Sequence, residues 1–438
     1  MNNPRENAIA LMNNNNKTWF FVRLCLVTGA GFFTAAYDLF AINLVSLMLG
    51  YVYYKEQKEL PENTDLCLKI SAQLGAIIGQ LLFGYLADRY GRKKMYGVEL
   101  MLSVGATISS TLAGNSPKVS IISSLIVYRF ILGIGAGGNY PLSAVITAEF
   151  LPPSNRGRWM AGVFAQQGLG ILFAGVVSVA MLAAFRSSIN ENEDNLDSVW
   201  RLVLGFGAVP GLAALFFRLT IPETPVYKIE VWQNPEQANH DMNQIVNERG
   251  IRYPQTEEEN VRGTNLTDFY TFFRGNPGYL KYLIGTCITW FCIDISFYGI
   301  GLNNATIFKE IGFDVSKTSE GAYTQLLNAS TGNIIITLLG TIPGYLMTMA
   351  LIDNRRVGRI KIMYIGFTAS AVLLLIFGVT YNNTVNNRAA FLVMFILIQI
   401  GFSKLRDVGG KDPTNANEFL GPLIAISAGF MTETPTIT

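Results

Sequence analysis

One apolar stretch of this chain contains far more glycine than a helix in water tolerates. The segment Arg129–Phe150 reads RFILGIGAGGNYPLSAVITAEF and carries four glycines, a proline and several polar side chains. Each glycine costs roughly 1 kcal/mol relative to alanine in a water-exposed helix, whereas helices in a bilayer use small residues to bring their backbones together. The segment is long enough to cross a membrane. We therefore expect a transmembrane helix that packs closely on a neighbour.

The same segment contains a pattern that has a different meaning in soluble proteins. Gly133, Gly135 and Gly138 satisfy G-x-G-x-x-G, which suggests a dinucleotide site when it follows a strand and opens a helix. Here the pattern lies inside one continuous apolar segment, so we reject the dinucleotide interpretation.

The rest of the chain is equally apolar and divides into blocks. Half of the 438 residues are hydrophobic, 15% are charged, and the mean hydropathy is +0.31. The blocks predict ten transmembrane helices, at 20–50, 69–88, 95–113, 120–149, 158–185, 200–221, 278–303, 326–352, 361–380 and 388–405. The sequence thus predicts an all-α multi-pass membrane protein in a lipid bilayer, with six helices, a polar segment and four helices. Met1–Lys17 is polar and lacks the apolar region of a signal peptide.

The distribution of basic residues predicts the orientation. The loops 89–94, 150–158 and 353–361 together hold ten Lys and Arg residues and lie on the same side. Because cytoplasmic loops are enriched in Lys and Arg, these loops, the N-terminus and the polar central segment are expected to be cytoplasmic. The orientation of the loops in the membrane accounts for the basic residues. The net charge of +2 therefore does not predict a nucleic-acid partner.

Two of these loops share an internal repeat. Residues 84–94 read GYLADRYGRKK, and residues 353–361 read DNRRVGRIK. The first loop resembles the major facilitator superfamily, which has G-x-L-x-D-R-x-G-R-K between its second and third helices; the second copy matches less closely. The resemblance implies two helical bundles. The alternative is that both loops are basic only because cytoplasmic loops are enriched in Lys and Arg. That alternative would explain the basic residues of the two loops but not their glycines and acids.

Two carboxylates lie near the middle of predicted spans. Asp38 occupies the first span and Asp294 the seventh. An ionised carboxylate at that depth costs about 3 kcal/mol or more, so each should face a polar cavity, which suggests a proton pathway. The alternative is that each acid caps or pairs within its bundle. The lone histidine, His240, lies in the polar central segment, so proton coupling would have to use carboxylates.

Longer motifs narrow the resemblance to the fungal and plant proton-coupled phosphate symporters of that superfamily. The similarity runs from about Phe20 to Ile400 and includes AAYDLFAINL, GGNYPLSAVITAEF, IPETPVY and WFCIDISFYG. It implies that phosphate binds midway across the membrane and moves with protons by alternating access. The implied phosphate contacts are Tyr140, Gln167, Trp290, Asp294 and Tyr298, and the implied proton pathway is Asp38, Asp294 and position 139. Ordinary interhelical packing is the alternative for the neutral side chains.

The sequence departs from the family pattern in two places. The fourth helix of the family reads G-G-D-Y-P-L-S, and here Asn139 replaces the acid, so this position cannot carry a proton. The resemblance also stops near Ile400, and the apolar run 419–430 would reach only about 18 Å as a helix, short of the roughly 30 Å hydrocarbon core. We therefore expect a truncated second bundle of four helices.

These inferences predict five regions. They are a cytoplasmic N-terminus (1–19), a six-helix bundle (20–225), a cytoplasmic linker (226–277), a four-helix bundle (278–405) and a divergent tail (406–438). The resemblance also implies a cytoplasmic gating network that holds the outward-facing state, made by Asp88, Arg92, Glu149, Arg156 and Arg158; simple topological anchoring is the alternative.

The predicted function is proton-coupled uptake of inorganic phosphate at the plasma membrane. A sugar or organic-ion carrier of the same superfamily and a truncated, non-transporting membrane protein are the alternatives. The sequence has no Walker A loop, no cluster of metal ligands and no nucleophile with a plausible base. We accordingly expect no enzyme activity, no catalytic residue, no metal site and no cofactor.

Overall fold

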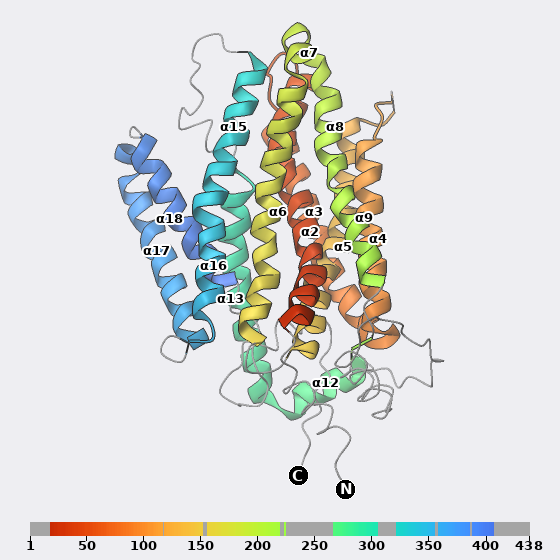
Figure 1. Ribbon diagram of the computed structural model, residues 1–438, viewed down its shortest axis with the longest axis vertical. Coiled ribbons are helices and arrows are strands. Elements are labelled where there is room, and N and C mark those ends of the chain that lie inside the picture. Colours follow the sequence, from red (N-terminus) through yellow and green to blue (C-terminus); the bar gives the residue numbers. More distant parts are fainter. Residues whose placement is uncertain are drawn as a thin grey trace.

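The computed structural model describes residues 18–116, 118–151, 156–219, 223–224, 266–304, 321–354, 358–385 and 388–406. In the first part of the chain the helices are α2 (Thr18–Tyr53), α3 (Glu62–Tyr90), α4 (Arg92–Thr111), α5 (Ile121–Phe150), α6 (Arg156–Ala184), α7 (Arg186–Glu191), η1 (Glu193–Asn195), α8 (Leu196–Phe206) and α9 (Ala208–Leu219). In the second part they are α12 (Leu266–Gly275), α13 (Pro277–Gly301), α15 (Ala322–Ile336), η2 (Thr337–Thr341), α16 (Ile342–Leu351), α17 (Gly358–Val385) and α18 (Arg388–Arg406). Figure 1 shows most of the long helices side by side along the longest axis.

This architecture confirms the predicted all-α class. Within the described ranges, six helical stretches are long and apolar enough to cross a membrane: Phe21–Tyr53, Glu62–Tyr90, Ile121–Phe150, Arg156–Ala184, Glu193–Leu219 and Ala322–Leu351. The helices α4, α13, α17 and α18 occupy the other four segments predicted from the sequence. Of the expected linker, 266–275 form α12, while 226–265 lie outside the described residues, as does the tail beyond Arg406.

The glycines of α5 allow its backbone to lie directly against that of α3. A Cβ atom added at Gly133 would overlap the carbonyl oxygen of Ala72, and one at Gly137 would overlap that of Ala76. From the other helix, a Cβ atom at Gly75 would overlap the backbone of α5. The close approach predicted from the glycine content is confirmed.

A single glycine makes the turn between α3 and α4. Gly91 has φ 98° and ψ 142°, in the half of conformational space that favours glycine, and its N–H donates to the carbonyl of Ala87 at 3.0 Å. This is the second glycine of the sequence GYLADRYGRKK. Because the chain turns at Gly91, α4 begins at Arg92, and the Arg92 side chain lies close to Asp88 at the end of α3.

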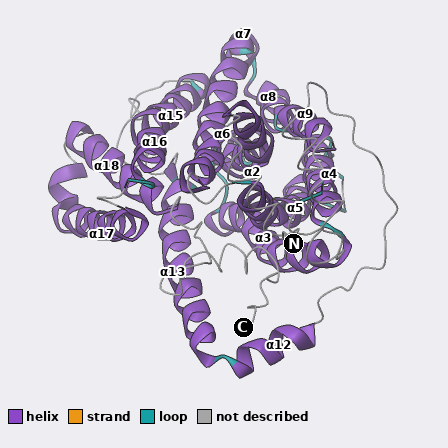
Figure 2. Cartoon of the chain, turned by 60° about the horizontal axis from the view of Figure 1, so that its bottom comes forward, coloured by secondary structure: helices purple, strands orange, loops and turns teal. Residues whose placement is uncertain are grey.

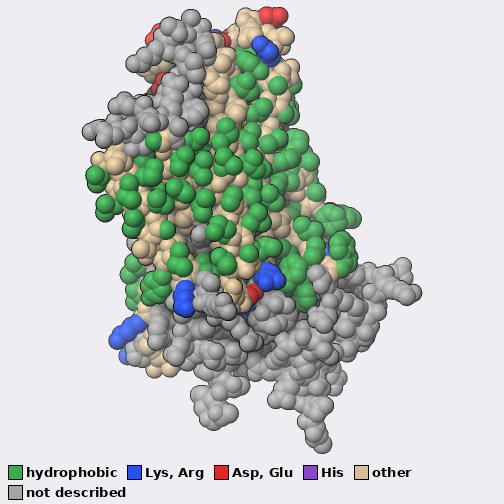
Figure 3. All heavy atoms as spheres, turned by 60° about the vertical axis from the view of Figure 1, so that its left-hand side comes forward, with side chains coloured by type: hydrophobic (Ala, Val, Ile, Leu, Met, Phe, Trp, Pro, Cys, Tyr) green, Lys and Arg blue, Asp and Glu red, His purple; other side chains and the backbone are tan. Residues whose placement is uncertain are grey.

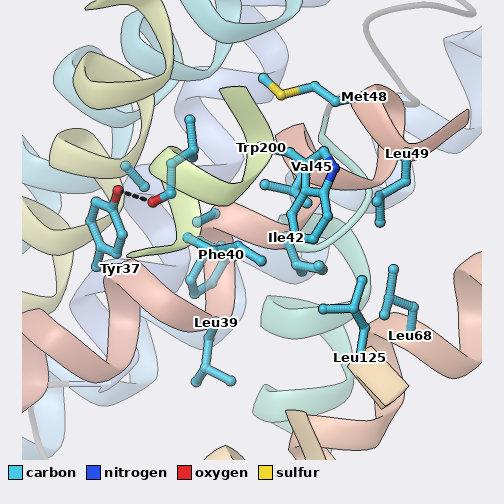
Figure 4. Close-up of a cluster of buried hydrophobic side chains, with 14 of the residues drawn as sticks. Tyr37, Leu39, Phe40, Ile42, Val45, Met48, Leu49, Leu68, Leu125 and Trp200 are labelled. Carbon is cyan, nitrogen blue, oxygen red and sulfur yellow. Dashed lines mark hydrogen bonds between the residues drawn. The ribbon is translucent and has the colours of Figure 1, made fainter. Parts of the chain in front are cut away.

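Trp200 lies fully buried in the interior of the first part of the chain. Figure 4 shows side chains of α2, including Ile42 and Val45, grouped with Trp200 of α8. The Tyr37 hydroxyl donates a hydrogen bond of 2.6 Å to the carbonyl of Val203, which satisfies the polar end of a buried ring.

The outer surface is apolar around the middle of the molecule. Figure 3 shows a broad band of hydrophobic side chains with Lys and Arg side chains below it. Large apolar side chains are highly exposed on several helices, including Val379 at 80% and Phe291 at 67%. Such a continuous surface suits hydrocarbon and not water, because soluble monomers rarely expose large apolar patches. The chain is a multi-pass membrane protein.

The two parts of the chain meet along α6. Figure 2 shows α15 and α16 beside α6, with α17 and α18 farther out. At this seam the hydroxyls of Ser178 and Ser330 lie 3.0 Å apart, and Gly168 lies against the ring of Tyr345. Small side chains on α6 therefore admit larger ones from the second part.

Candidate functional site

Three of the predicted phosphate contacts lie on one face of α13. Trp290, Asp294 and Tyr298 follow each other at intervals of four residues, which places them on the same side of a helix. All three are half-buried, whereas Phe291 and Ile295 on the adjacent face are exposed. This face of α13 is therefore turned toward the rest of the protein.

The other two predicted contacts join this face through hydrogen bonds. The hydroxyls of Tyr298 and Tyr140 lie 3.2 Å apart, and the Gln167 Nε2 donates to the Tyr140 hydroxyl at 3.4 Å. The Tyr345 hydroxyl, which the sequence analysis did not single out, donates to the Gln167 Oε1 at 3.5 Å. We call these four side chains the hydroxyl–amide line. It connects α13 and α16 with α5 and α6.

Two phenylalanines of α2 hold the tyrosine rings of this line. Phe32 meets Tyr140 edge to face with ring centroids 5.1 Å apart, and Phe40 stacks on Tyr298 at 6.2 Å. Trp290 packs against the same hydrophobic cluster as Tyr140. Apolar walls thus surround a row of neutral hydrogen-bond donors, and the carboxyl of Asp294 lies on the same face of α13 as Trp290 and Tyr298.

Asp38 lies inside the first part of the chain, in contact with other helices. Its Oδ2 accepts a hydrogen bond of 2.9 Å from the Thr107 hydroxyl of α4. The buried Arg129 of α5 donates from Nη1 to the Asp38 carbonyl at 3.3 Å and from Nε to the Leu68 carbonyl at 3.0 Å. The described contacts of Asp38 are thus within its own bundle, and its place on a proton pathway stays a prediction.

Asn139 faces a buried ion pair that the sequence analysis missed. Its Oδ1 accepts from the Arg218 Nη2 at 2.5 Å and from the Ser143 hydroxyl at 3.0 Å. Arg218 also pairs with Glu99, and its guanidinium lies 3.6 Å from the centre of the Tyr96 ring. Glu99 is 0% and Arg218 2% exposed. Each charge interrupts a predicted apolar span, which is the signal that could have singled out each of the two residues.

Three of the predicted gating residues meet at the end of the molecule that carries loops 89–94 and 150–158, here called the basic end. Arg92 pairs with Glu149 and lies 3.7 Å from the Asp88 carboxylate. Glu223, from the IPETPVY motif, accepts a hydrogen bond of 3.2 Å from the Lys93 amide. Burial raises the pKa of the Glu223 carboxyl, while this amide and the Arg92 charge oppose the rise.

Of the other two predicted gating residues, Arg156 interacts electrostatically with Glu149, and Arg158 contacts the second part of the chain. Arg156 donates from Nε and Nη2 to the carbonyl of Leu151 at 3.4 and 3.2 Å. The Arg158 side chain is exposed, and its backbone amide donates to the Asp353 Oδ2 at 2.9 Å. Asp353 begins the second copy of the basic-loop repeat, so this contact joins the two parts of the chain.

Known proteins share this architecture and much of this sequence. The model of the Major Facilitator Superfamily matches residues 31–404. A repressible high-affinity phosphate permease of Neurospora crassa is 36% identical over 423 residues, covering 92% of this chain and 73% of that protein. The inorganic phosphate transporter PHO84 of Saccharomyces cerevisiae is 34% identical over 421 residues, covering 90% and 70%.

Solved structures of the superfamily share the fold. The xylose transporter XylE from E. coli, in a partially occluded inward-open conformation, matches with a TM-score of 0.65 at 18% identity, covering 93% of this chain and 89% of that chain. At this identity the likeness concerns the fold alone. The family model and the fungal relatives together establish that the chain belongs to the major facilitator superfamily, within the family of these phosphate transporters.

Proposed function

We propose that this protein carries inorganic phosphate across a membrane together with protons, by alternating access. One structural observation supports the proposal in addition to the similarity to phosphate transporters. The hydroxyl–amide line joins α13 to α5 and α6, and it starts on the face of α13 that also bears Asp294. A substrate bound there would touch both parts of the chain, as the substrate of a two-bundle carrier must.

The chemistry of these side chains suits a protonated oxyanion. Tyrosine hydroxyls, a glutamine amide and an indole N–H donate hydrogen bonds to oxygen without adding charge. Asp294 would repel an anion unless the pair shares a proton. Binding phosphate beside Asp294 therefore requires a proton, and this requirement couples the two.

Contacts between the two parts at the far end of the molecule supply a gate. We call this the distal end; there the Asn43 Nδ2 donates to the Gly301 carbonyl at 2.7 Å, and the Lys69 ammonium donates to the Asn303 Oδ1 at 3.3 Å. We infer that the basic end faces the cytoplasm, as does the N-terminus, and that the host is the plasma membrane. Alternating access then requires the distal contacts and the contact between Arg158 and Asp353 at the basic end to break in turn, so that the central site opens to one side at a time.

Purified protein in proteoliposomes tests the function. We expect saturable uptake of radiolabelled phosphate that an inward proton gradient stimulates and an uncoupler suppresses. Excess xylose or glucose should leave uptake unchanged. Phosphate uptake no higher than that of empty liposomes would contradict the proposal, and uptake of radiolabelled glucose or xylose by the same proteoliposomes would favour a sugar carrier.

Asp294→Asn tests the site. The amide keeps the shape of the side chain but cannot exchange a proton, so we expect phosphate uptake to be lost while expression and membrane insertion stay intact. Asp194→Asn is the matched control, because Asp194 forms an exposed ion pair with Lys55, and such pairs contribute little. Wild-type uptake by Asp294→Asn would show that the site is wrongly assigned.

A further inference from the structure

The two ends of the Gln167 amide make different hydrogen bonds. The NH₂ group donates to Tyr140, and the oxygen accepts from Tyr345, whose hydroxyl is a donor at that contact. Gln167 is fully buried, so water does not replace either partner. An amide turned over by 180° would present its oxygen to the Tyr140 side, where an anion needs a donor.

We propose that Tyr345 is a positioning residue for phosphate: its hydroxyl holds the Gln167 amide with the NH₂ group directed to the Tyr140 side of the site. This role rests on the proposed phosphate site and adds to it a residue that touches Gln167 and acts through it. Without the Tyr345 hydroxyl, both orientations of the amide become accessible, and only one of them donates to phosphate.

The surroundings of Tyr345 fix its ring in this place. Its side chain is 1% exposed, and a Cβ atom added at Gly168 would lie 2.9 Å from the ring. The glycine directly after Gln167 therefore leaves the space that the ring fills. A buried ring has few rotamers available, so its hydroxyl is held at one point.

A change of helix type before α16 sets the direction of Tyr345. Residues Thr337–Thr341 form the π-helical turn η2, in which the amide of Ile342 donates to the carbonyl of Thr337. Such a turn contains one residue more than an α-helical turn. Removing that residue would rotate α16 by about 100° relative to α15 and turn Tyr345 away from Gln167. Figure 1 shows α15 and α16 in one column beside α6.

A double-mutant cycle on phosphate binding tests the role. The variants are Tyr345→Phe, Gln167→Ala and the double variant of the purified 438-residue chain, with the dissociation constant for radiolabelled inorganic phosphate as the readout. Loss of one hydrogen bond should make Tyr345→Phe bind about three- to tenfold more weakly. In the Gln167→Ala background, the same change should alter affinity by less than about twofold, because the amide it orients is gone.

Tyr37→Phe is the matched control. It also removes one buried tyrosine hydroxyl, whose acceptor is the Val203 carbonyl and not a side chain of the site. We expect this variant to lower the melting temperature and to leave phosphate affinity unchanged. Equal losses of affinity in Tyr37→Phe and Tyr345→Phe would mean that packing alone is responsible, which overturns the positioning role.

Two further results would also overturn it. Wild-type affinity in Tyr345→Phe would show that the amide needs no partner, and an undiminished effect of Tyr345→Phe in the Gln167→Ala background would show that the two side chains act separately. If Gln167→Ala itself binds normally, the positioning role fails. The proposed function is then still decided by the uptake of radiolabelled phosphate into proteoliposomes, so the two failures are distinguishable.

Discussion

At the scale of single residues, position 139 decides the charge of a buried cluster. Arg218 and Glu99 carry opposite charges, and Asn139 adds none, so the three side chains are neutral together. The Asn139 oxygen accepts from the guanidinium as a carboxylate oxygen would. The amide therefore resembles a protonated acid that cannot release its proton.

Asn139→Asp should make transport depend more strongly on the proton gradient. One guanidinium cannot neutralise two carboxylates away from water, so the variant cluster needs a proton to stay neutral. The measurement is phosphate uptake as a function of external pH, with and without an uncoupler, for the variant and the unaltered chain. Equal sensitivity of the two to the uncoupler would count against a proton site at this position.

The double variant Glu99→Gln with Asn139→Asp provides the control for charge. It keeps one carboxylate for one guanidinium, so the cluster is neutral without a proton. We expect the pH dependence of its uptake to return toward that of the unaltered chain. A double variant as pH-dependent as Asn139→Asp alone would show that cluster charge is not the cause.

At the scale of helices, the contact between α3 and α5 depends on backbone meeting backbone. Gly137→Ala places a methyl group where the Ala76 carbonyl lies, and we expect a loss of about 1–3 kcal/mol, as for other overpacked sites. Gly105→Ala is the matched control, since a Cβ atom there meets nothing within 4 Å. Thermal unfolding in detergent should show a lower melting temperature for the first variant only. Equal melting temperatures would contradict this account of the seam.

Helices were the most predictable feature of the fold, because length and hydropathy suffice to identify a membrane span. Their interruptions were not. The expected span 326–352 contains the π-helical turn η2, and the span 200–221 divides at Gly207, against which Asp38 and Tyr37 pack. A helix that faces lipid on one side and apolar side chains on the other is apolar all round. Its sequence therefore has little alternation of polar and apolar residues, and a local break in the helix does not change the hydropathy pattern.

In the candidate site, the sequence predicted the residues that belong to recognisable motifs and missed those outside them. Tyr140 and Tyr298 came from quoted motifs, and the structure brings their hydroxyls together. Arg218 and Glu99 are 119 residues apart, and no local pattern joins them. Tyr345 was missed because its contact with Gln167 depends on the π-helical turn η2, and no sequence pattern predicts that turn.

At the scale of the whole molecule, the distal contacts hold the two parts together on one side. Lys69→Ala combined with Asn43→Ala removes a hydrogen bond to Asn303 and another to the Gly301 carbonyl. We expect the distal end to spend more time open. Electron–electron distance measurements between spin labels at the exposed Asn63 and Gly321, in a cysteine-free background, should show a longer component.

Lys55→Ala is the control for this experiment. It breaks an exposed ion pair with Asp194, and both residues belong to the first part of the chain. The distance distribution should not change in this variant. An unchanged distribution in the Lys69→Ala and Asn43→Ala double variant would mean that other contacts keep the distal end closed.

The ion pair between Glu99 and Arg218 also sets an order of events during synthesis. The acid enters the membrane with α4, and its cation arrives only with α9, 119 residues later. At about 5–20 residues per second, the ribosome needs roughly 6–24 s to make that stretch. During this interval the nascent chain holds a carboxylate whose permanent partner has not yet been made. Helix α9 therefore completes the folding of the first part, and a ribosome that stalls before α9 leaves in the membrane a bundle in which Glu99 can be neutral only by holding a proton.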